Sequence, residues 1–273
     1  MTQIIKHQSI PKISGIINAL FFLVFKTFTF TTDMKKEPTI YSEIVLAKSG
    51  GKKLLAILLD PDKIEWGNFS DLTAKINASP ATHLLVGGSH VFSDKIDELV
   101  LNLKKQCRLP VVLFPGNPSQ ISTYADGILF LSLLSGRNPD FLIGHHANAA
   151  PVLKASNLEI IPTGYILVES GSQTAVARIS QTEPMAIATP ERILHTAQAG
   201  EMLGKKLVYL EAGSGAQNPV PVEIISLVSK NIDIPVVVGG GIKSKQGIES
   251  AFAAGADLVV IGTAFETDLN FFD

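Results

Sequence analysis

Two carboxylates, Asp60 and Glu211, each follow a run of apolar residues at a point where the chain turns. Asp60 ends the stretch LLAILLD and precedes a proline, and Glu211 ends LVYLE and precedes the glycine-rich segment AGSGAQNP. An acid at the end of a buried strand can bind a divalent cation, accept hydrogen bonds from a substrate hydroxyl or take a proton. These two carboxylates are therefore the first candidates for a catalytic site.

Two glycine-rich turns near the C-terminus are suited to binding a phosphate group. One is GGG at 239–241, which leads into a helix that Ser244 can cap, and the other is Gly262-Thr263. Glycines let backbone N–H groups face an anion, and a following helix N-terminus adds a favourable dipole. The alternative is that these glycines only form tight turns. Two such turns at consecutive strand ends favour phosphate binding.

Each carboxylate has a functional and a structural interpretation. Mg²⁺ binds one or two carboxylates and completes its shell with substrate oxygens, so Asp60 is a candidate ligand and Ser89, after the next apolar run, could add an oxygen. The alternative for Asp60 is a cap on the turn at Pro61. Glu211 would be repelled by a phosphate, so we expect it to face a substrate hydroxyl. The alternative for Glu211 is a structural salt bridge.

These candidates share one site only if the apolar runs end at the same edge of a sheet. From residue 40 onward, apolar runs alternate with amphipathic stretches. Runs that are apolar throughout are typical of parallel strands covered on both faces. The predicted strands are Leu54–Asp60, His83–Gly88, Pro110–Gly116, Gly127–Leu133, Glu159–Glu169, Leu207–Gly213, Pro235–Ile242 and Asp257–Phe265.

This alternation predicts an α/β fold, a (β/α)8 TIM barrel, with an open doubly wound sheet as the alternative. Helix starts are predicted at Thr189-Pro190, at Pro221 and at Ser244. The connection 117–126 is too short for a full helix, so one helix is predicted to be short or missing. In such a barrel the site lies at the carboxyl ends of the strands, where both carboxylates and both glycine turns fall.

Composition excludes several classes of protein. The net charge of -2 and the pI near 6.3 argue against a protein that binds nucleic acid. The one cysteine, Cys107, allows no internal disulfide, which suits a reducing compartment. The apolar run at 16–25 is too short to span a bilayer. We expect residues 1–33 to be an extension outside the fold, arising from a misplaced start codon, and residues 34–273 to form one barrel domain.

The adjacent pair His145-His146 is interpreted as structural, because neighbouring side chains on a helix diverge and cannot hold one metal ion. The sequence contains no zinc-ligand spacing, Ser-His-Asp arrangement, P-loop or dinucleotide fingerprint.

A set of motifs, in order along the chain, closely resembles the geranylgeranylglyceryl phosphate synthase family and its heptaprenylglyceryl phosphate synthase relatives. The motifs are LLDPDK, LLVGGS, LFPGNPSQIS, GYILVESGSQTAVARIS, YLEAGSGA, VVVGGGIKS and VVIGTAF. The resemblance covers residues from about 40 to 266, and YLEAGSGA together with GGGI is its most specific part. The segment RNPDFLIGHHA, Arg137 to Ala147, resembles the branch that includes archaeal and Bacteroidetes-type bacterial enzymes.

The resemblance implies a modified (β/α)8 barrel that lacks one helix, and a Mg²⁺-dependent prenyltransferase. Such an enzyme joins the C3 hydroxyl of sn-glycerol 1-phosphate to geranylgeranyl diphosphate and releases diphosphate, a step in phospholipid biosynthesis. It implies that Asp60 and Ser89 hold Mg²⁺. Our hypothesis of the mechanism makes Asp60 and Glu211 catalytic, with Glu211 holding the glycerol C3 hydroxyl and accepting its proton. Arg178, in the polar loop after the fifth predicted strand, is a further candidate for contact with the diphosphate.

The resemblance also implies a glycerol-phosphate cradle. Its residues are Tyr209, Leu210, Glu211, Ala212, Gly213, Ser214, Gly215, Gly240, Gly241, Gly262 and Thr263. Thr263 stands where many family members have asparagine, and we expect little change because either residue supplies a backbone N–H.

The proposed product is a lipid, so we expect a cytoplasmic protein that makes transient contact with a membrane surface. We also expect a homo-oligomer, because the family forms dimers and hexamers. The prenyl chain needs an apolar groove, and Tyr124 and Phe130 are candidates for its lining. A heptaprenyl donor is the alternative to geranylgeranyl.

Other functions stay open on the residues alone. A phosphate-binding barrel of the isomerase type could use Asp60 as a second acid or base near Glu211. An aldolase is disfavoured because the predicted strands contain no lysine for a Schiff base. A barrel that binds phosphate without catalysis is disfavoured by the presence of both carboxylates.

Overall fold

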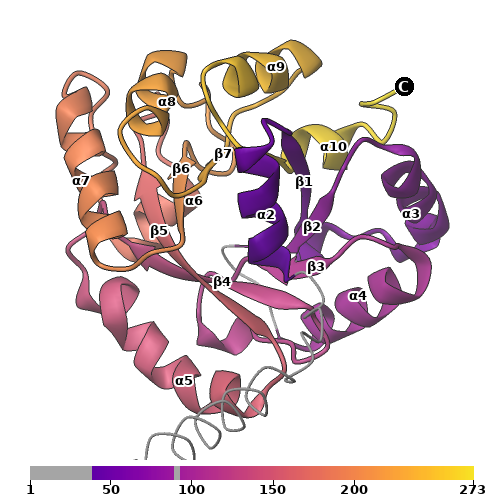
Figure 1. Cartoon of the computed structure of the whole chain (residues 1–273). Helices are drawn as coiled ribbons and strands as arrows, with labels where there is room; N and C mark the ends of the chain where they lie inside the picture. The colour runs from indigo at the N-terminus through magenta and orange to yellow at the C-terminus, as the bar shows by residue number, and fades with distance from the viewer. Residues whose placement is uncertain (1–38, 89–92) are drawn as a thin grey trace, which may run out of the picture. The chain divides into compact units, whose positions relative to one another are not determined.

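The computed structural model describes residues 39–88 and 93–273, which form a closed barrel of parallel strands (Figure 1). Each strand pairs with the next along the chain, and the last closes the ring on the first through pairs such as Ala56 with Val260. The strands are β1 (Leu54–Leu59), β2 (His83–Val86), β3 (Val111–Leu113), β4 (Gly127–Leu133), β5 (Glu159–Leu167), β6 (Leu207–Glu211), β7 (Val236–Gly239) and β8 (Leu258–Ile261). The barrel predicted from the sequence is confirmed, and the open sheet is excluded.

Helices surround the barrel and begin where the capping residues predict. Pro190 is the first residue of its helix, Pro221 immediately precedes another, and the Ser244 hydroxyl accepts a hydrogen bond from the Gly247 N–H (3.1 Å). The helices are α2 (Ile40–Ser49), α3 (Phe69–Ala78), α4 (Ser93–Gln106), α5 (His145–Ala155), α6 (Ala175–Ser180), α7 (Pro190–Met202), α8 (Val222–Ser229), α9 (Lys245–Ala253) and α10 (Thr263–Thr267).

The connection between β3 and β4 contains no α-helix. All of its residues are described, and their one regular turn is the 3-10 segment Pro118–Gln120. The prediction of a missing helix is therefore confirmed. As a result, no helix of this connection covers the outer face of β4.

The core has an inner part inside the barrel and an outer part between strands and helices. Side chains alternate between the two along β6: Val208 and Leu210 belong to the outer cluster, and Leu207 and Tyr209 to the inner one. Because successive side chains of a strand point to opposite faces, Glu211 follows Tyr209 into the barrel interior. The strand that makes the core thus also aims the candidate acid.

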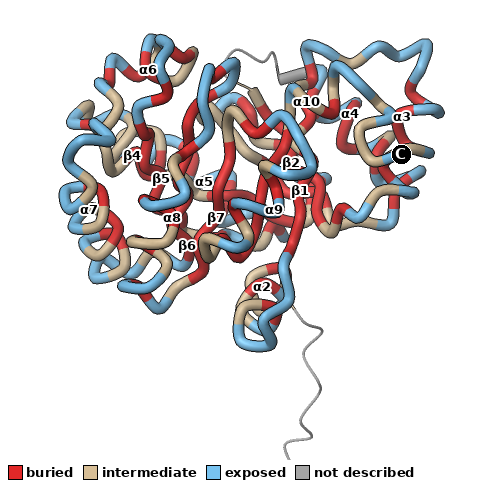
Figure 2. Tube along the Cα trace, turned by 90° about the horizontal axis from the view of Figure 1, so that it is seen from above, coloured by how far each residue is buried: buried red, intermediate tan, exposed pale blue. Residues whose placement is uncertain are grey.

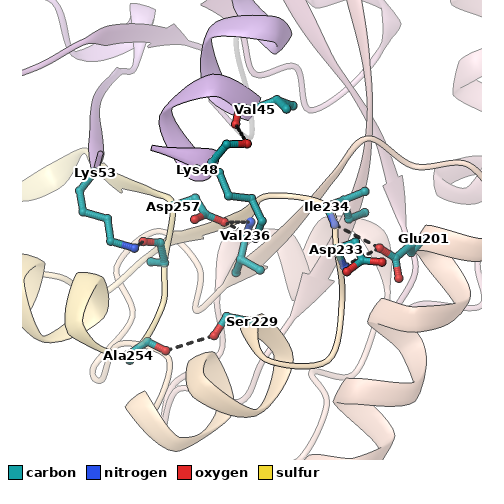
Figure 3. Close-up of polar contacts among 12 residues, drawn as sticks. Val45, Lys48, Lys53, Glu201, Ser229, Asp233, Ile234, Val236, Ala254 and Asp257 are labelled. Carbon is teal, nitrogen blue, oxygen red and sulfur yellow. Dashed lines mark hydrogen bonds and ion pairs between the residues drawn. The ribbon is translucent and has the colours of Figure 1, made fainter. Parts of the chain in front are cut away.

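The amino end of the barrel is closed by α2, whose Ile40 and Ile44 belong to the inner cluster (Figure 1). Polar contacts fasten this end (Figure 3). Asp257 accepts hydrogen bonds from the Lys48 ammonium (3.0 Å) and the Val236 N–H (2.9 Å), which ties α2 to the sheet. In barrels of this kind the amino end serves stability, which leaves the opposite end for chemistry.

Some predictions fall outside the described residues. These are the extension at 1–33 and the oxygen ligand Ser89. Among the described helices, none combines the length and apolar character needed to cross a bilayer.

Candidate active site

A cavity of about 950 Å³ lies at the carboxyl ends of the strands. Asp60 and Glu211 both line it, and so do Gly240, Gly241 and Gly262 from the two glycine turns. Figure 2 shows α6 and α10, which follow strand ends, at the opposite end of the barrel from α2. The structure therefore brings both carboxylates and both turns into one site, as the sequence analysis required.

Glu211 is buried at the base of this cavity, with 5% of its surface exposed. Its Oε1 accepts a hydrogen bond from the Gly213 N–H at 2.6 Å, a contact made within the turn that follows β6. Burial raises the pKa of Glu211 from its ordinary 4.5 to about 7, and the Gly213 N–H and the Tyr209 hydroxyl offset part of that rise. A carboxylate with a pKa near neutrality is suited to accepting a proton at physiological pH.

Three aromatic rings, those of Phe114, Tyr165 and Tyr209, pack together near Glu211. Ring centroids lie 5.5 Å apart for Tyr165 and Tyr209 and 5.3 Å apart for Phe114 and Tyr209. Burial, together with the charge of Glu211, raises the pKa of both tyrosines well above 10, so both are neutral. The Tyr209 hydroxyl has no well-aligned hydrogen-bond partner among the described residues, which leaves a donor beside the acid.

Gly240 packs directly against Glu211. Its φ of 79° lies in the left-handed region, and a Cβ there would collide with Glu211 Oε1 and lie 2.6 Å from the Gly213 N. Only glycine fits both the conformation and the space. The β7 turn and the acid of β6 are therefore packed together as one unit.

Asp60 has both of the roles that its sequence position suggested. Its Oδ1 accepts the Asp62 N–H (3.1 Å) and so caps the 3-10 turn Pro61–Lys63, yet the residue also lines the cavity. Among the described residues there is no group of three side chains that could hold a metal ion. A single carboxylate on a cavity wall fits Mg²⁺, which takes most of its oxygens from water and substrate.

Lys63 and Glu266 join Asp60 at this side of the cavity. The Lys63 ammonium lies 2.9 Å from Glu266 Oε2 and 3.6 Å from Asp60 Oδ2. Burial alone would lower the pKa of Lys63, but the hydrogen bond and charge of Glu266, with those of Asp60, raise it, so the lysine is charged. No role in the site was predicted from the sequence for Lys63 or for Glu266.

The cavity has an apolar arm between β4 and α5, lined by Ile128 and Phe130 of β4 and by Ala149 of α5. Phe130 thus lies on the cavity wall, and its contact with a prenyl chain stays a prediction, whereas Tyr124 is half exposed and does not line the cavity. Further apolar residues that line the cavity are Phe114, Ile121, Leu129, Leu131, Leu133, Phe141, Val176 and Ile179.

The two adjacent histidines diverge as expected. His146 packs edge-on against Phe130 (4.3 Å between centroids) and lies within hydrogen-bonding distance of the Ser132 hydroxyl (3.2 Å), whereas His145 packs against Phe141. Both nevertheless line the cavity, which their adjacency gave no reason to expect.

Three predicted site residues do not line the cavity. Leu210 and Ala212 point outward into the outer core, so a ligand in the cavity does not meet their side chains. Arg178 is exposed on α6 and is not part of the cavity wall, although its neighbours Val176 and Ile179 are. The remaining described cradle residues, which are Tyr209, Glu211, Gly213, Ser214, Gly215, Gly240, Gly241, Gly262 and Thr263, all line it.

Comparison with known proteins agrees with this geometry. Residues 51–271 match the model of the PcrB family. The geranylgeranylglyceryl phosphate synthase of Flavobacterium johnsoniae is 64% identical over 235 residues, which cover 86% of this chain and 97% of that protein. The protein of the same name from Zunongwangia profunda is 50% identical over 229 residues, covering 84% and 97% respectively.

A solved structure is also similar. It is (S)-3-O-geranylgeranylglyceryl phosphate synthase from Thermoplasma acidophilum in complex with its substrate sn-glycerol-1-phosphate. It superposes with a TM-score of 0.80 at 31% identity, covering 86% of this chain and 94% of that one.

Proposed function

Because the chain belongs to the PcrB family, we propose that it acts as a geranylgeranylglyceryl phosphate synthase. This enzyme is a prenyltransferase that joins the C3 hydroxyl of sn-glycerol 1-phosphate to geranylgeranyl diphosphate. The products are the prenyl ether of glycerol phosphate and free diphosphate, and the reaction belongs to phospholipid biosynthesis.

One observation carries the proposal: a single cavity is lined by Glu211, by the glycine turn packed against it, by Asp60 and by an apolar arm. The turn at Gly240 can bind the phosphate of the small substrate, and Glu211 then faces its hydroxyl groups. Asp60 is available for the diphosphate side, and the arm along β4 for the prenyl chain. No other assignment uses all four features.

The chain's own residues supply most of the chemistry. The N–H groups of the β7 and β8 turns fix the phosphate, which orients the C3 hydroxyl toward the prenyl donor. Glu211 accepts the proton of that hydroxyl as its oxygen bonds to C1 of the prenyl chain and the bond from C1 to the diphosphate breaks. Asp60 would hold Mg²⁺, which when bound offsets the charge that develops on the diphosphate.

The donor is assigned as geranylgeranyl diphosphate from the relatives, with a heptaprenyl donor as the alternative. The apolar arm supports a long hydrocarbon chain, since Ile128, Phe130 and Phe141 offer it an apolar wall. We further propose that the protein is cytoplasmic, forms a homo-oligomer and contacts a membrane surface transiently, because its product is an amphipathic lipid.

The proposed function is tested by incubation with sn-glycerol 1-phosphate and a panel of farnesyl, geranylgeranyl, farnesylgeranyl and heptaprenyl diphosphates, with and without Mg²⁺. Mass spectrometry of the products should show the geranylgeranyl ether, in the presence of Mg²⁺ only. sn-Glycerol 3-phosphate is the matched control, and it should give little product. Absence of any prenylated product would refute the proposal, and consumption of the glycerol phosphate without the prenyl donor would favour an isomerase.

A further inference from the structure

Lys63 lines the cavity beside Asp60, on the wall that the proposed function assigns to the diphosphate. Among the described lining residues, the one other lysine or arginine is Lys243, which belongs to the β7 turn on the phosphate side and contacts the Gln217 carbonyl (3.3 Å). Arg178, the cation that the sequence suggested, does not line the cavity. A diphosphate carries more negative charge than one Mg²⁺ neutralises, so a second cation is expected where it binds.

Lys63 is held in a closed ring of contacts around Asp60. The Asp60 N–H donates to Glu266 Oε1 (2.9 Å), Glu266 Oε2 accepts from the Lys63 ammonium (2.9 Å), and this ammonium lies 3.6 Å from Asp60 Oδ2. Glu266 is largely buried, with 12% of its side chain exposed. Glu266 therefore fixes both the backbone of the candidate metal ligand and the ammonium that faces its carboxylate.

The contact of Lys63 with Asp60 is suited to exchange. At 3.6 Å it is too long for a hydrogen bond, and the lysine side chain is 47% exposed, so the pair is electrostatic and weak. A magnesium ion binds a carboxylate oxygen at about 2.0–2.1 Å. An ammonium in this position would lie within a few ångströms of the bound ion and be repelled by it. Lys63 and a metal ion therefore compete for Asp60 Oδ2.

Building on the proposed function, we propose that Lys63 is a diphosphate-binding residue that neutralises Asp60 in the empty enzyme and turns to the diphosphate when a metal ion binds. Glu266 is its positioning residue. The ammonium has three donors on a flexible stem, so it can leave Asp60 Oδ2 and reach oxygens of a diphosphate held at the same wall. The negative charge of Asp60 is thus compensated by Lys63 in the empty enzyme and by the metal ion once that ion is bound.

The first test measures metal binding to the ligand-free protein. Titration with Mn²⁺, followed by electron paramagnetic resonance, should show Lys63→Gln binding Mn²⁺ about two- to fivefold more tightly than the wild type, because a competing cation is gone. Lys95→Gln is the matched control: Lys95 pairs with Asp62 on the same turn (2.8 Å) but does not line the cavity, so its loss should leave the affinity unchanged. Unchanged or weaker binding by Lys63→Gln would overturn the competition.

The second test measures binding of inorganic diphosphate in the presence of Mg²⁺ by calorimetry. Lys63→Gln should bind it roughly tenfold more weakly, since one charge-assisted hydrogen bond is lost, whereas Lys63→Arg should restore most of the affinity. A merely structural role for Lys63 predicts no such rescue and no gain in Mn²⁺ affinity. Equal affinities of Lys63→Gln and wild type would refute the diphosphate role.

The role of Glu266 is tested with a double variant. Glu266→Gln should weaken Mn²⁺ binding, because the released ammonium then pairs with Asp60 alone. In Lys63→Gln/Glu266→Gln this effect should disappear, and persistence of the full effect would refute the action of Glu266 through Lys63.

These binding measurements separate the inference from the proposed function. Loss of Mn²⁺ binding in Asp60→Asn would show that the wild type binds the ion through Asp60. If the wild type bound Mn²⁺ in this way but gave no prenylated product, the proposed function would fail. The exchange of Lys63 could still be measured in that case. If the product formed but Lys63→Gln matched the wild type in both titrations, the inference alone would fail.

Discussion

Replacing Glu211 by glutamine should stabilise the ligand-free protein at alkaline pH. The rise of the Glu211 pKa from 4.5 to about 7 reflects the free energy of holding a charge in a buried position. At about 1.36 kcal/mol for each pKa unit, this burial destabilises the folded state by about 3 kcal/mol once the carboxyl is ionised in both states. Glutamine keeps an acceptor for the Gly213 N–H, and the charge-assisted part of that bond is already contained in the pKa of about 7. The expected net gain at pH 8 is therefore about 3 kcal/mol.

The gain must depend on pH with a definite sign. Below the unfolded pKa of 4.5 the carboxyl is protonated in both states, so its burial carries no ionic cost. Between 4.5 and about 7 the unfolded chain ionises first, and the wild type loses stability as the pH rises. The advantage of Glu211→Gln should consequently fall from about 3 kcal/mol at pH 8 to about 1 kcal/mol or less at pH 5.

Equilibrium unfolding in urea at pH 5, 6, 7 and 8 measures this difference. Circular dichroism and the fluorescence of Trp66, the single tryptophan, should report the same transition. If Glu211→Gln were less stable than the wild type by the same amount at every pH, the carboxyl would not have a raised pKa, and the argument for Glu211 as a base near neutrality would lose its physical support.

If Glu211 is the proton acceptor, kcat/KM for sn-glycerol 1-phosphate should rise with pH through about pH 7. Glu211→Gln should lower kcat about 100-fold or more and give a pH profile that is flat. A wild-type profile that is flat around pH 7 would contradict the proton acceptor role. Gly240→Ala should lower the free energy of unfolding in urea by about 2 kcal/mol or more, because the added Cβ meets Glu211. The control Gly215→Ala has a similar φ but nothing within 4 Å of its Cβ, so it should lose only about 1 kcal/mol. Equal losses for the two variants would refute the collision. Asp60→Asn should abolish Mg²⁺-dependent turnover while circular dichroism and unfolding stay near wild type, and retained Mg²⁺ dependence would reject Asp60 as the ligand. Phe130→Ala should shift the products of the donor panel toward longer chains, and an unchanged distribution would place the chain elsewhere.

The fold could be predicted because parallel strands leave a strong signal. Each is buried on both faces, so each reads as an unbroken apolar run, and all eight predicted runs contain the observed strands. The same reasoning located Asp60, Glu211 and the glycine turns, since a barrel collects the carboxyl ends of its strands on one rim. The missing helix was also visible, because a short connection cannot hold one.

Side-chain orientation follows in part from the sequence. Residues of a strand alternate between its faces, so the inward orientation of Tyr209 implies that Leu210 and Ala212 point outward and that Glu211 points inward. The alternation would also have found Tyr165, which lies directly across from Tyr209 in the sheet register. A cradle defined as the continuous segment from 209 to 215 does not separate the inward side chains from the outward ones.

The pairing of Lys63 with Glu266 could not be predicted from the sequence. The two residues are 203 positions apart and meet only because β8 closes the ring on β1, which brings α10 beside the turn that follows β1. The register of that closure is a property of the whole barrel. Arg178 illustrates the converse: its place in a polar loop after a strand suggested a ligand contact, but its position on α6 turns it away from the cavity.

The outer face of β4 links the fold to the proposed specificity. On β6, the outward side chains Val208 and Leu210 pack in the outer cluster with Ile193 of α7 and do not line the cavity. On β4, Ile128 belongs to the same cluster, yet it lines the cavity together with Phe130, which packs edge-on against His146 of α5. The cavity therefore has an apolar wall between β4 and α5, whereas the candidate carboxylates Asp60 and Glu211 lie at the strand ends. Changes on the outer face of β4 should for this reason alter which prenyl chain is accepted and leave the pKa of Glu211 unchanged, because that pKa is set by burial at the end of β6.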